Sequence, residues 1–313
     1  MVARSTTHTL SRTRKKSNAI RETAGDRVFL IGVYSILGLI FVAVLYPLVY
    51  IVSSSFSSAT AVQRGAVWLW PVQPTLDGYR AVFQDNLLLT GFVNSVFYTG
   101  VGSLVSVALT VMMAYPLSRS YFVGRRIVIW ALLFALLFNG GLIPFYLVVK
   151  DLGLLNTRWA LILPAALGIF QVFLAKSFFQ TTINTELYEA AQLDGCSELQ
   201  FFRKVVLPLS GSIMAVLFLL YAVGQWNSYF NALIFLNDQS LYPLQLVLRG
   251  LLIMGQNQVS MTAMTPEQYA QLQNMVTLLK YAVIVVVTVP MLLLYPFVQK
   301  YFVKGVMLGS LKE

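Results

Sequence analysis

The segment EAAQLDGCSELQFFRKVVLP, residues 189–208, decides how the rest of this chain is interpreted. It is a polar break between apolar segments that are too long for a helix in the core of a soluble protein. The loop that contains most of it, residues 181–206, holds four of the twelve acidic residues of the chain. Basic residues otherwise predominate on this side of the apolar segments. We therefore expect a loop between two membrane-spanning helices that meets a positively charged partner.

The composition places the chain among multi-span membrane proteins. Of its 313 residues, 58% are hydrophobic and 11% are charged, and the mean hydropathy is +0.72. These values are atypical of globular enzymes. The net charge of +10 could indicate a nucleic-acid-binding protein, but the cations are spread around the apolar segments and form no patch interleaved with aromatic residues. We therefore do not expect a nucleic-acid partner.

Six apolar segments are long enough to cross a membrane as helices, because about 20 apolar residues span about 30 Å of hydrocarbon. If the N-terminus is cytoplasmic, 16 of the 22 Lys and Arg lie on the cytoplasmic side, which fits the positive-inside rule. The sequence thus predicts an all-α membrane protein with both termini in the cytoplasm. Its expected parts are a basic N-terminal tail (1–28), a six-helix transmembrane domain (29–303) and a C-terminal tail (304–313). The expected spans are roughly 29–52, 92–116, 127–149, 159–180, 207–236 and 276–299.

Residues that carry catalysis, metal binding or energy coupling are sparse. Cys196 is the only cysteine, and His8, the only histidine, lies in the basic tail, so we expect neither an intrachain disulfide nor a metal site. The dipeptide Gly-Lys occurs nowhere, so this chain has no P-loop, and ATP with its Mg must bind other subunits. We expect no cofactor on this chain.

Two alternative functions follow from the same inventory. None of the six expected spans contains Asp or Glu, which disfavours an ion-coupled secondary carrier, although sodium sites built from hydroxyls and carbonyls would be compatible with the sequence. The second alternative is a membrane-embedded enzyme. The chain has neither a nucleophile elbow nor a paired-carboxylate site to support one.

Capping residues within the polar loop predict two short helices. Asn184 or Thr185 can cap the first helix, and Gly195 is placed to close it in the left-handed conformation. Ser197 and Gln200 have the spacing of a capping box for the second helix. Helices this short are marginal in isolation, so their order should come from packing on the membrane domain and on a partner.

The spacing of the polar segment resembles the EAA loop of ATP-binding-cassette importer permeases. Glu-Ala-Ala is followed by three residues and Gly195, then by nine residues, Val205, one residue and Leu-Pro. In that family the motif forms a coupling helix that docks in a groove of the ATP-binding subunit. Pro208 is also expected to open the fifth span. The resemblance implies that the residues in contact with an ATP-binding subunit are Glu189, Ala190, Ala191, Asp194, Gly195, Leu207 and Pro208.

The resemblance extends over nearly the whole chain, to six-span carbohydrate permeases of the MalG-like family and, within it, to the LplC-type branch. It is carried by residues 139–144 (NGGLIP), 225–227 (QWN) and 304–310 (KGVMLGS). It implies a type I importer permease (MetI-like) fold in the inner membrane of a bacterium. The implied partners are a second homologous permease subunit, two ATP-binding subunits, an extracytoplasmic solute-binding protein and an oligosaccharide substrate. Residues 305–313 are a second candidate contact with the ATP-binding subunits.

Polar residues that interrupt the apolar segments are candidates for a sugar path. Hydroxyl-rich solutes are bound through amide hydrogen bonds and aromatic faces. For each of these side chains, a hydrogen bond between helices is the alternative interpretation. The residues are Asn139, Gln171, Gln225, Trp226, Asn227, Tyr229 and Asn231.

Two further patterns are interpreted as structural. Ser95, Thr99 and Ser103 share one face of a helix and suit close packing against a second helix. The glycine pair at 140–141, together with Pro144, is predicted to break or kink the third span.

Overall fold

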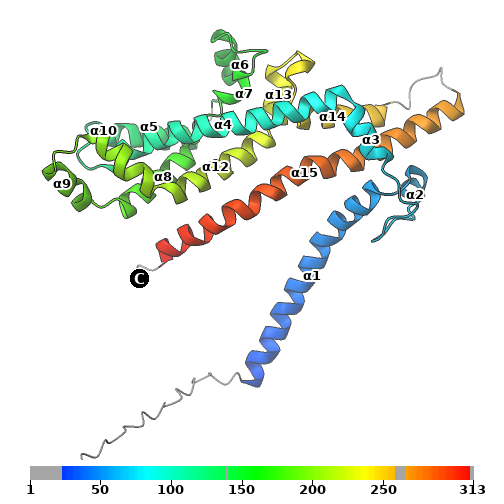
Figure 1. Cartoon of the computed structure of the whole chain (residues 1–313), viewed down its shortest axis with the longest axis horizontal. Helices are drawn as coiled ribbons and strands as arrows, with labels where there is room; N and C mark the ends of the chain where they lie inside the picture. Colours follow the sequence, from blue (N-terminus) through cyan, green and yellow to red (C-terminus); the bar gives the residue numbers. More distant parts are fainter. Residues whose placement is uncertain (1–22, 139, 258–264, 311–313) are drawn as a thin grey trace, which may run out of the picture. The chain divides into compact units, whose positions relative to one another are not determined.

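The computed structural model describes residues 23–138, 140–257 and 265–310, and side-chain surroundings are described only as far as residue 296 in the last helix. The described part is helical throughout and contains no strand. The chain forms two compact units, of which the first ends at Val49 and the second begins at Tyr50. The first unit holds most of helix α1, Ala24–Ser55, and all other helices belong to the second (Figure 1).

Helix α4, Asn86–Ser118, is the centre of the second unit. Asp85 caps it, because its side chain accepts hydrogen bonds from the backbone N–H groups of Leu87 (2.8 Å) and Leu88 (3.1 Å). Helices that pack against α4 include α8 (Ile169–Thr182), α12 (Gly211–Trp226), α14 (Leu244–Asn257) and, near its start, α3 (Asp77–Gln84). Figure 1 shows α12 running beside α4 for much of its length.

Small residues allow these helices to approach α4 closely. Ser95, Thr99 and Ser103 are all buried, and the Ser95 hydroxyl accepts a hydrogen bond from the backbone N–H of Leu244 at 2.8 Å. A Cβ atom added to Gly102 would lie 3.0 Å from the side-chain nitrogen of Gln225 on α12. The face predicted for helix packing is therefore used for it.

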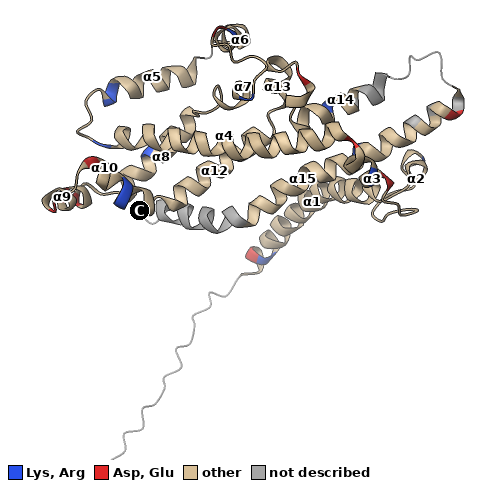
Figure 2. Cartoon of the chain, turned by 45° about the horizontal axis from the view of Figure 1, so that its top comes forward, with Lys and Arg blue, Asp and Glu red and all other residues tan. Residues whose placement is uncertain are grey.

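Long apolar helices account for only part of the expected spans. Within the described residues, α1, α4 and the stretch Gln273–Pro296 of α15 (Pro266–Ser310) are each long and apolar enough to cross a membrane. A fourth span results if Glu198–Leu209 and Gly211–Trp226, which meet at 74°, are counted as one bent crossing. Figure 2 shows that α4 and α12 carry no charged residue. The structure thus shows several candidate spans.

Three of the six expected spans are not single helices. Segment 127–149 is divided into α5 (Arg125–Leu137) and α6 (Leu142–Asp151). Gly141 precedes α6 with a φ of +86°, which a residue with a side chain rarely adopts. The break at the glycine pair was predicted, and Pro144 lies in the first turn of α6, where its missing N–H costs nothing.

In the other two divided segments, a helix ends at residues that interrupt helical hydrogen bonding. Segment 159–180 holds the short α7 (Trp159–Ile162) and α8, and Pro164 lies in the connection between them. Segment 207–236 is divided into α11 (Leu207–Leu209), α12 and α13 (Tyr229–Phe235). At the end of α12, the side chains of Asn227 and Ser228 donate to the carbonyls of Val223 (2.8 Å) and Gln225 (2.7 Å). These bonds take up terminal carbonyl groups that a continuing helix would use.

Candidate functional site

The first half of the polar loop is a short helix closed by a glycine. Helix α9 runs from Thr185 to Leu193, and Gly195 follows with a φ of +75°. The N–H of Gly195 donates to the carbonyl of Gln192, and the N–H of Cys196 donates to the carbonyl of Ala191, both at 2.9 Å. This pair of bonds is a Schellman motif, so the prediction that Gly195 closes the helix in the left-handed conformation is confirmed. Asn184 occupies the N-cap position but makes no side-chain capping bond.

The second half of the loop is longer than predicted. The capping box is present, with Gln200 N–H to Ser197 Oγ at 3.4 Å and Ser197 N–H to Gln200 Oε1 at 3.1 Å. Helix α10 (Glu198–Phe201) then continues through a wide π-helical turn, η1 (Phe202–Val206), into α11. The sharp bend comes only at Ser210, after which α12 begins.

The position of Pro208 corrects the prediction that it opens the fifth span. It lies within α11, the last turn of the second loop helix, and α12 begins at Gly211. Proline lacks the N–H that would bond the carbonyl of Lys204, and its ring would crowd that carbonyl in a regular α-helix. The π-helical turn widens the backbone at this place. The Leu-Pro pair therefore belongs to the loop helix.

The inner face of the loop is packed into the core of the second unit. Phe201 and Val206 are fully buried beside residues of α4, α8 and α12. The Tyr188 and Phe201 ring centroids are 5.2 Å apart, and those of Tyr115 and Phe202 are 5.0 Å apart. Because both halves of the loop contribute rings to this core, the two short helices are held as one body.

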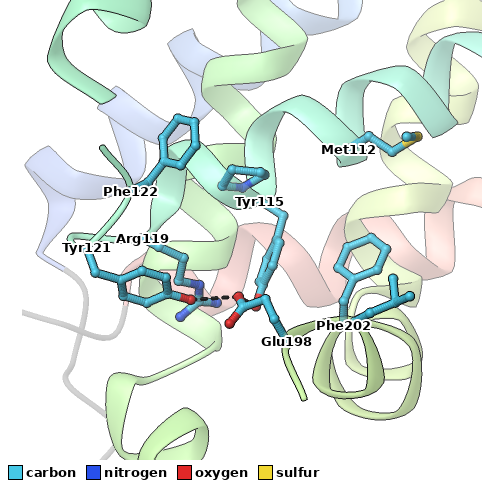
Figure 3. Close-up of a pocket in the computed structure, with 9 residues that line it drawn as sticks. Met112, Tyr115, Arg119, Tyr121, Phe122, Glu198 and Phe202 are labelled. Atoms are coloured by element: carbon cyan, nitrogen blue, oxygen red, sulfur yellow. Dashed lines mark hydrogen bonds between the residues drawn. The ribbon is translucent and has the colours of Figure 1, made fainter. Parts of the chain in front are cut away.

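Glu198 fastens the second loop helix to the end of α4 (Figure 3). Its carboxylate accepts hydrogen bonds from the hydroxyls of Tyr115 (3.0 Å) and Tyr121 (2.7 Å), and Figure 3 shows the guanidinium of Arg119 beside them. Partial desolvation by itself would raise the pKa of Glu198. Hydrogen bonds from the hydroxyls of Tyr188, Tyr121 and Tyr115, together with the charge of Arg119, outweigh this effect and hold the pKa below its usual value. Glu198 is therefore ionised at neutral pH and accepts from several donors at once.

The outer face of the loop is left uncovered by the described part of the chain. No residue of α9 is buried, and Glu189, Ala190 and Asp194 are all exposed, whereas Ala191 is half-buried against the core. Leu193, at the end of α9, is 90% exposed, and Leu199, on α10, is 64% exposed. Acidic and apolar side chains thus share a surface that a partner protein can cover.

Sequence reasoning missed Tyr115, Arg119 and Tyr121 as partners of the loop. Arg119 is buried, its Nη1 donates to the carbonyl of Ile183 at 3.0 Å, and its guanidinium carbon lies 4.8 Å from the centroid of the Tyr115 ring. These residues are about eighty positions from Glu198 in the sequence. A local motif gives no signal for such a pairing.

The structure does not gather the predicted sugar-path residues into one place. Gln225 is buried and its Nε2 donates to the carbonyl of Leu161 at 3.4 Å. Trp226 is buried, its Nε1 donates to the carbonyl of Val287 on α15 at 3.1 Å, and its ring meets Phe92 edge to face. For Gln225 and Trp226, contacts between helices are therefore the interpretation that the geometry supports.

The remaining path candidates occupy separate positions. Asn227 is exposed and bonds its own helix, Tyr229 is exposed, and Asn231 is half-buried on α13. Gln171 is half-buried on α8 with its side chain against Gly168. Asn139 and residues 311–313 of the C-terminal tail lie outside the described residues. Within the described residues, no three side chains of His, Cys, Asp or Glu come together as metal ligands would.

Comparison with known proteins gives consistent matches. Residues 121–308 match the family model of the binding-protein-dependent transport system inner membrane component. The chain is 40% identical to the protein LplC of Bacillus subtilis (strain 168), over 94% of this chain and 98% of that protein. It is also 40% identical to the polygalacturonan/rhamnogalacturonan transport system permease protein YtcP of the same organism, over 92% of this chain and 99% of that protein.

A solved structure with the same fold comes from a bacterial ABC transporter involved in the import of the acidic polysaccharide alginate. The TM-score is 0.81 and the sequence identity is 34%, and the match covers 90% of this chain and 99% of that one. This likeness agrees with the predicted type I importer permease fold.

Proposed function

The chain belongs to the family of binding-protein-dependent transport system inner membrane components, and from this premise we propose that it moves oligosaccharides into the cell together with a second, homologous permease subunit. As a member of this family it is a multi-pass inner-membrane permease component that does not hydrolyse ATP itself and carries no cofactor. It works in a complex with an ATPase and a solute-binding protein. The proposed composition is two permease subunits, two ATP-binding subunits that hold ATP and Mg, and one extracytoplasmic binding protein.

The observation that carries the proposal is the two-sided construction of the loop at residues 181–210. Its inner face is packed into the core formed with α4, α8 and α12, and Glu198 ties it to the end of α4. Its outer face exposes Glu189, Asp194 and Leu193. A force applied to the outer face by an ATP-binding subunit is therefore passed to these helices without first deforming the loop. The proposed coupling residues are those of the EAA segment.

The substrate class follows from the relatives. One is named for transport of polygalacturonan and rhamnogalacturonan, and the solved structure belongs to a transporter of alginate, an acidic polysaccharide. We propose oligosaccharide fragments of acidic polysaccharides as the first substrates to test. Exposed Asn227 and Tyr229, at the junction of α12 and α13, are the candidates with free surface to contact a sugar, and Gln171 and Asn231 are half-buried candidates.

Transport by the reconstituted complex tests the proposed function. Proteoliposomes that contain both permeases, the ATP-binding subunits and the binding protein are expected to take up a labelled oligogalacturonate only with ATP on the side of the ATP-binding subunits. Glu189→Ala should lower uptake by about tenfold or more, because it removes a charge-assisted contact of roughly 1.5–3 kcal/mol. Glu186→Ala is the matched control, since Glu186 is exposed on the same helix outside the EAA segment.

Two results would contradict this function. Uptake by the permease chain alone under an ion gradient would support the ion-coupled carrier, and equal effects of the two glutamate substitutions would remove the assigned role of Glu189. The comparison of the two glutamate variants needs complexes that still assemble, which co-purification of the ATP-binding subunits verifies.

Topology is tested through the only thiol of the chain. We propose six spans with both termini cytoplasmic, a tail at 1–28 and a second tail at 304–313. Cys196 then faces the cytoplasm in the half-buried turn of the loop. A membrane-impermeant maleimide should label it in inverted vesicles but not in intact cells, and bound ATP-binding subunits should slow the reaction.

A matched control makes the labelling result specific. In a Cys196→Ser background, Trp70→Cys replaces a residue that is 81% exposed in the segment expected outside the cell. This variant should show the reverse pattern of labelling. Efficient labelling of native Cys196 in intact cells would overturn the orientation, provided that a denatured sample shows the thiol to be free.

A further inference from the structure

A polar cavity lies at the base of the loop, separate from the surface assigned to the ATP-binding subunit. It has a volume of about 210 Å³ and is lined by the end of α4, the connection to α5 and the start of α5, and by residues near the junction of α8 and α9. Its lining includes Arg119, Ser120, Arg125, Gln180 and Thr185. No Asp or Glu is among its lining residues.

Arg119, which lines this cavity, is buried and has guanidinium donors without a partner in the described part of the chain. Its relative exposure is 6%, and only Nη1 makes a hydrogen bond, to the carbonyl of Ile183. Nε and Nη2 are buried and have no partner within the described residues. Because a buried charged donor without a partner is costly, this arrangement points to an acceptor that the described residues do not supply.

Further positive charge surrounds the same space. Arg125 is half-buried and commits Nε to the carbonyl of Leu117 at 2.9 Å. Lys176 donates to Oε1 of Gln180, a lining residue, at 3.1 Å. The carboxylate of Glu198, which lines a neighbouring cavity, attracts the charge of Arg119. Within the described residues, however, Arg119, Arg125 and Lys176 make no ion pair within 4 Å. The cluster therefore keeps an excess of positive charge.

We propose that this cavity binds a phosphate group. The guanidinium fork matches the oxygens of a phosphate, and two arginines with a nearby lysine supply the charge that a phosphate needs. The hydroxyls of Ser120 and Thr185 line the cavity and can donate to further oxygens. The phosphate belongs either to the headgroup of an anionic lipid or to a soluble phosphate, since the cavity is at the end of helices that the topology places at the membrane surface.

A bound phosphate would add a contact shared by four elements at the base of the loop. It would connect α4, α5, α8 and α9, and so stiffen the base of the loop. This consequence for coupling rests on the proposed function, whereas the binding itself does not. Binding is therefore measured first and without transport.

The test uses the intact importer in neutral-lipid nanodiscs and compares Arg125→Gln with Arg126→Gln. Arg126 is the adjacent, exposed arginine and does not line the cavity. Calorimetric titration with inorganic phosphate at constant ionic strength tests the soluble source, and native mass spectrometry of complexes purified with phosphatidylglycerol tests the lipid source. Arg125→Gln should lower the affinity for the ligand that occupies the cavity about tenfold, because one charge-assisted contact is lost. Arg126→Gln should bind that ligand with the affinity of the native protein.

Each outcome of this comparison decides the proposal. Weaker phosphate binding in Arg125→Gln alone supports a soluble phosphate, and loss of one retained phosphatidylglycerol in the same variant supports a lipid headgroup. Arg125→Lys, which keeps the charge, should restore binding in part, and an unchanged melting temperature shows that the fold is intact. Equal binding of both probes to all variants, or no binding to the native complex, would overturn the phosphate site. These binding results do not depend on transport. If the variants still take up sugar, the proposed function stands whether or not the cavity binds phosphate.

Discussion

Replacing Gly195 with valine is expected to lower ATP-driven uptake at least tenfold while the permease still inserts in the membrane. Gly195 has a φ of +75° in the turn between the two loop helices. For a residue with a side chain, this left-handed conformation is about 1–2 kcal/mol less favourable than the right-handed one, and the difference is larger for a β-branched residue. A Cβ added there would meet no atom within 4 Å, so the cost is backbone strain and not a clash. The strained turn would change the angle between the two helices of the loop.

Asparagine at the same position separates strain from the loss of glycine itself. Asparagine tolerates the left-handed region better than other residues with side chains, so Gly195→Asn should retain most of the uptake. ATP hydrolysis and uptake are measured together, because a displaced loop should uncouple them. Native coupling in Gly195→Val would show that the turn geometry is not needed, and equal damage from valine and asparagine would argue for a direct contact of glycine with the partner.

Trp226→Ala is expected to destabilise the permease by about 3–5 kcal/mol, the usual cost of removing a large buried aromatic side chain. The ring is buried where α12 meets α15, and its Nε1 donates to the carbonyl of Val287. Removing it leaves a cavity and takes away a hydrogen bond between these helices. We expect a lower melting temperature in detergent and less permease in the membrane.

The neighbouring Asn227 is the matched control for that substitution. Its side chain is exposed and, among the described residues, bonds only the carbonyl of Val223 in its own helix. Asn227→Ala should therefore leave the melting temperature within a few degrees of the native value. If Asn227 contacts the sugar, its replacement should lower uptake more than basal ATP hydrolysis. A fully stable Trp226→Ala complex that fails only in uptake would return Trp226 to the sugar path.

The loop was predictable because its signals are local. A capping box needs two residues three positions apart, and a Schellman turn needs a glycine directly after a helix, so both were expected from residues 195–200 and both are present. The length of the second loop helix was not predicted, because proline is common in the first turn of a helix and Pro208 was therefore expected to begin the next one. The π-helical turn that allows Pro208 to lie near the end of this helix is a backbone adjustment, and no residue pattern predicts it.

The sugar path stays a prediction, and the apolar composition of the spans explains why the sequence does not decide it. A helix that is hydrophobic all round does not show in its sequence which side faces a neighbour, lipid or a pore. Gln225 and Trp226 read as path residues because they are polar or amphipathic within an apolar run. Their actual partners, Leu161 and Val287, offer backbone carbonyls, which every residue has. Nothing in the sequence identifies such an acceptor.

The sequence by itself determined the class of the protein, its expected orientation and the motif through which we propose that it meets an ATPase, since these depend on composition, charge distribution and fixed local spacing. The tertiary structure alone decided that the expected fourth and fifth spans are divided, which polar residues are used between helices, and how Glu198 is held by Tyr115 and Tyr121. It also decided that the buried Arg119 lines a cavity without an acid. These features depend on contacts between residues far apart in the chain, and such contacts arise only when the helices pack.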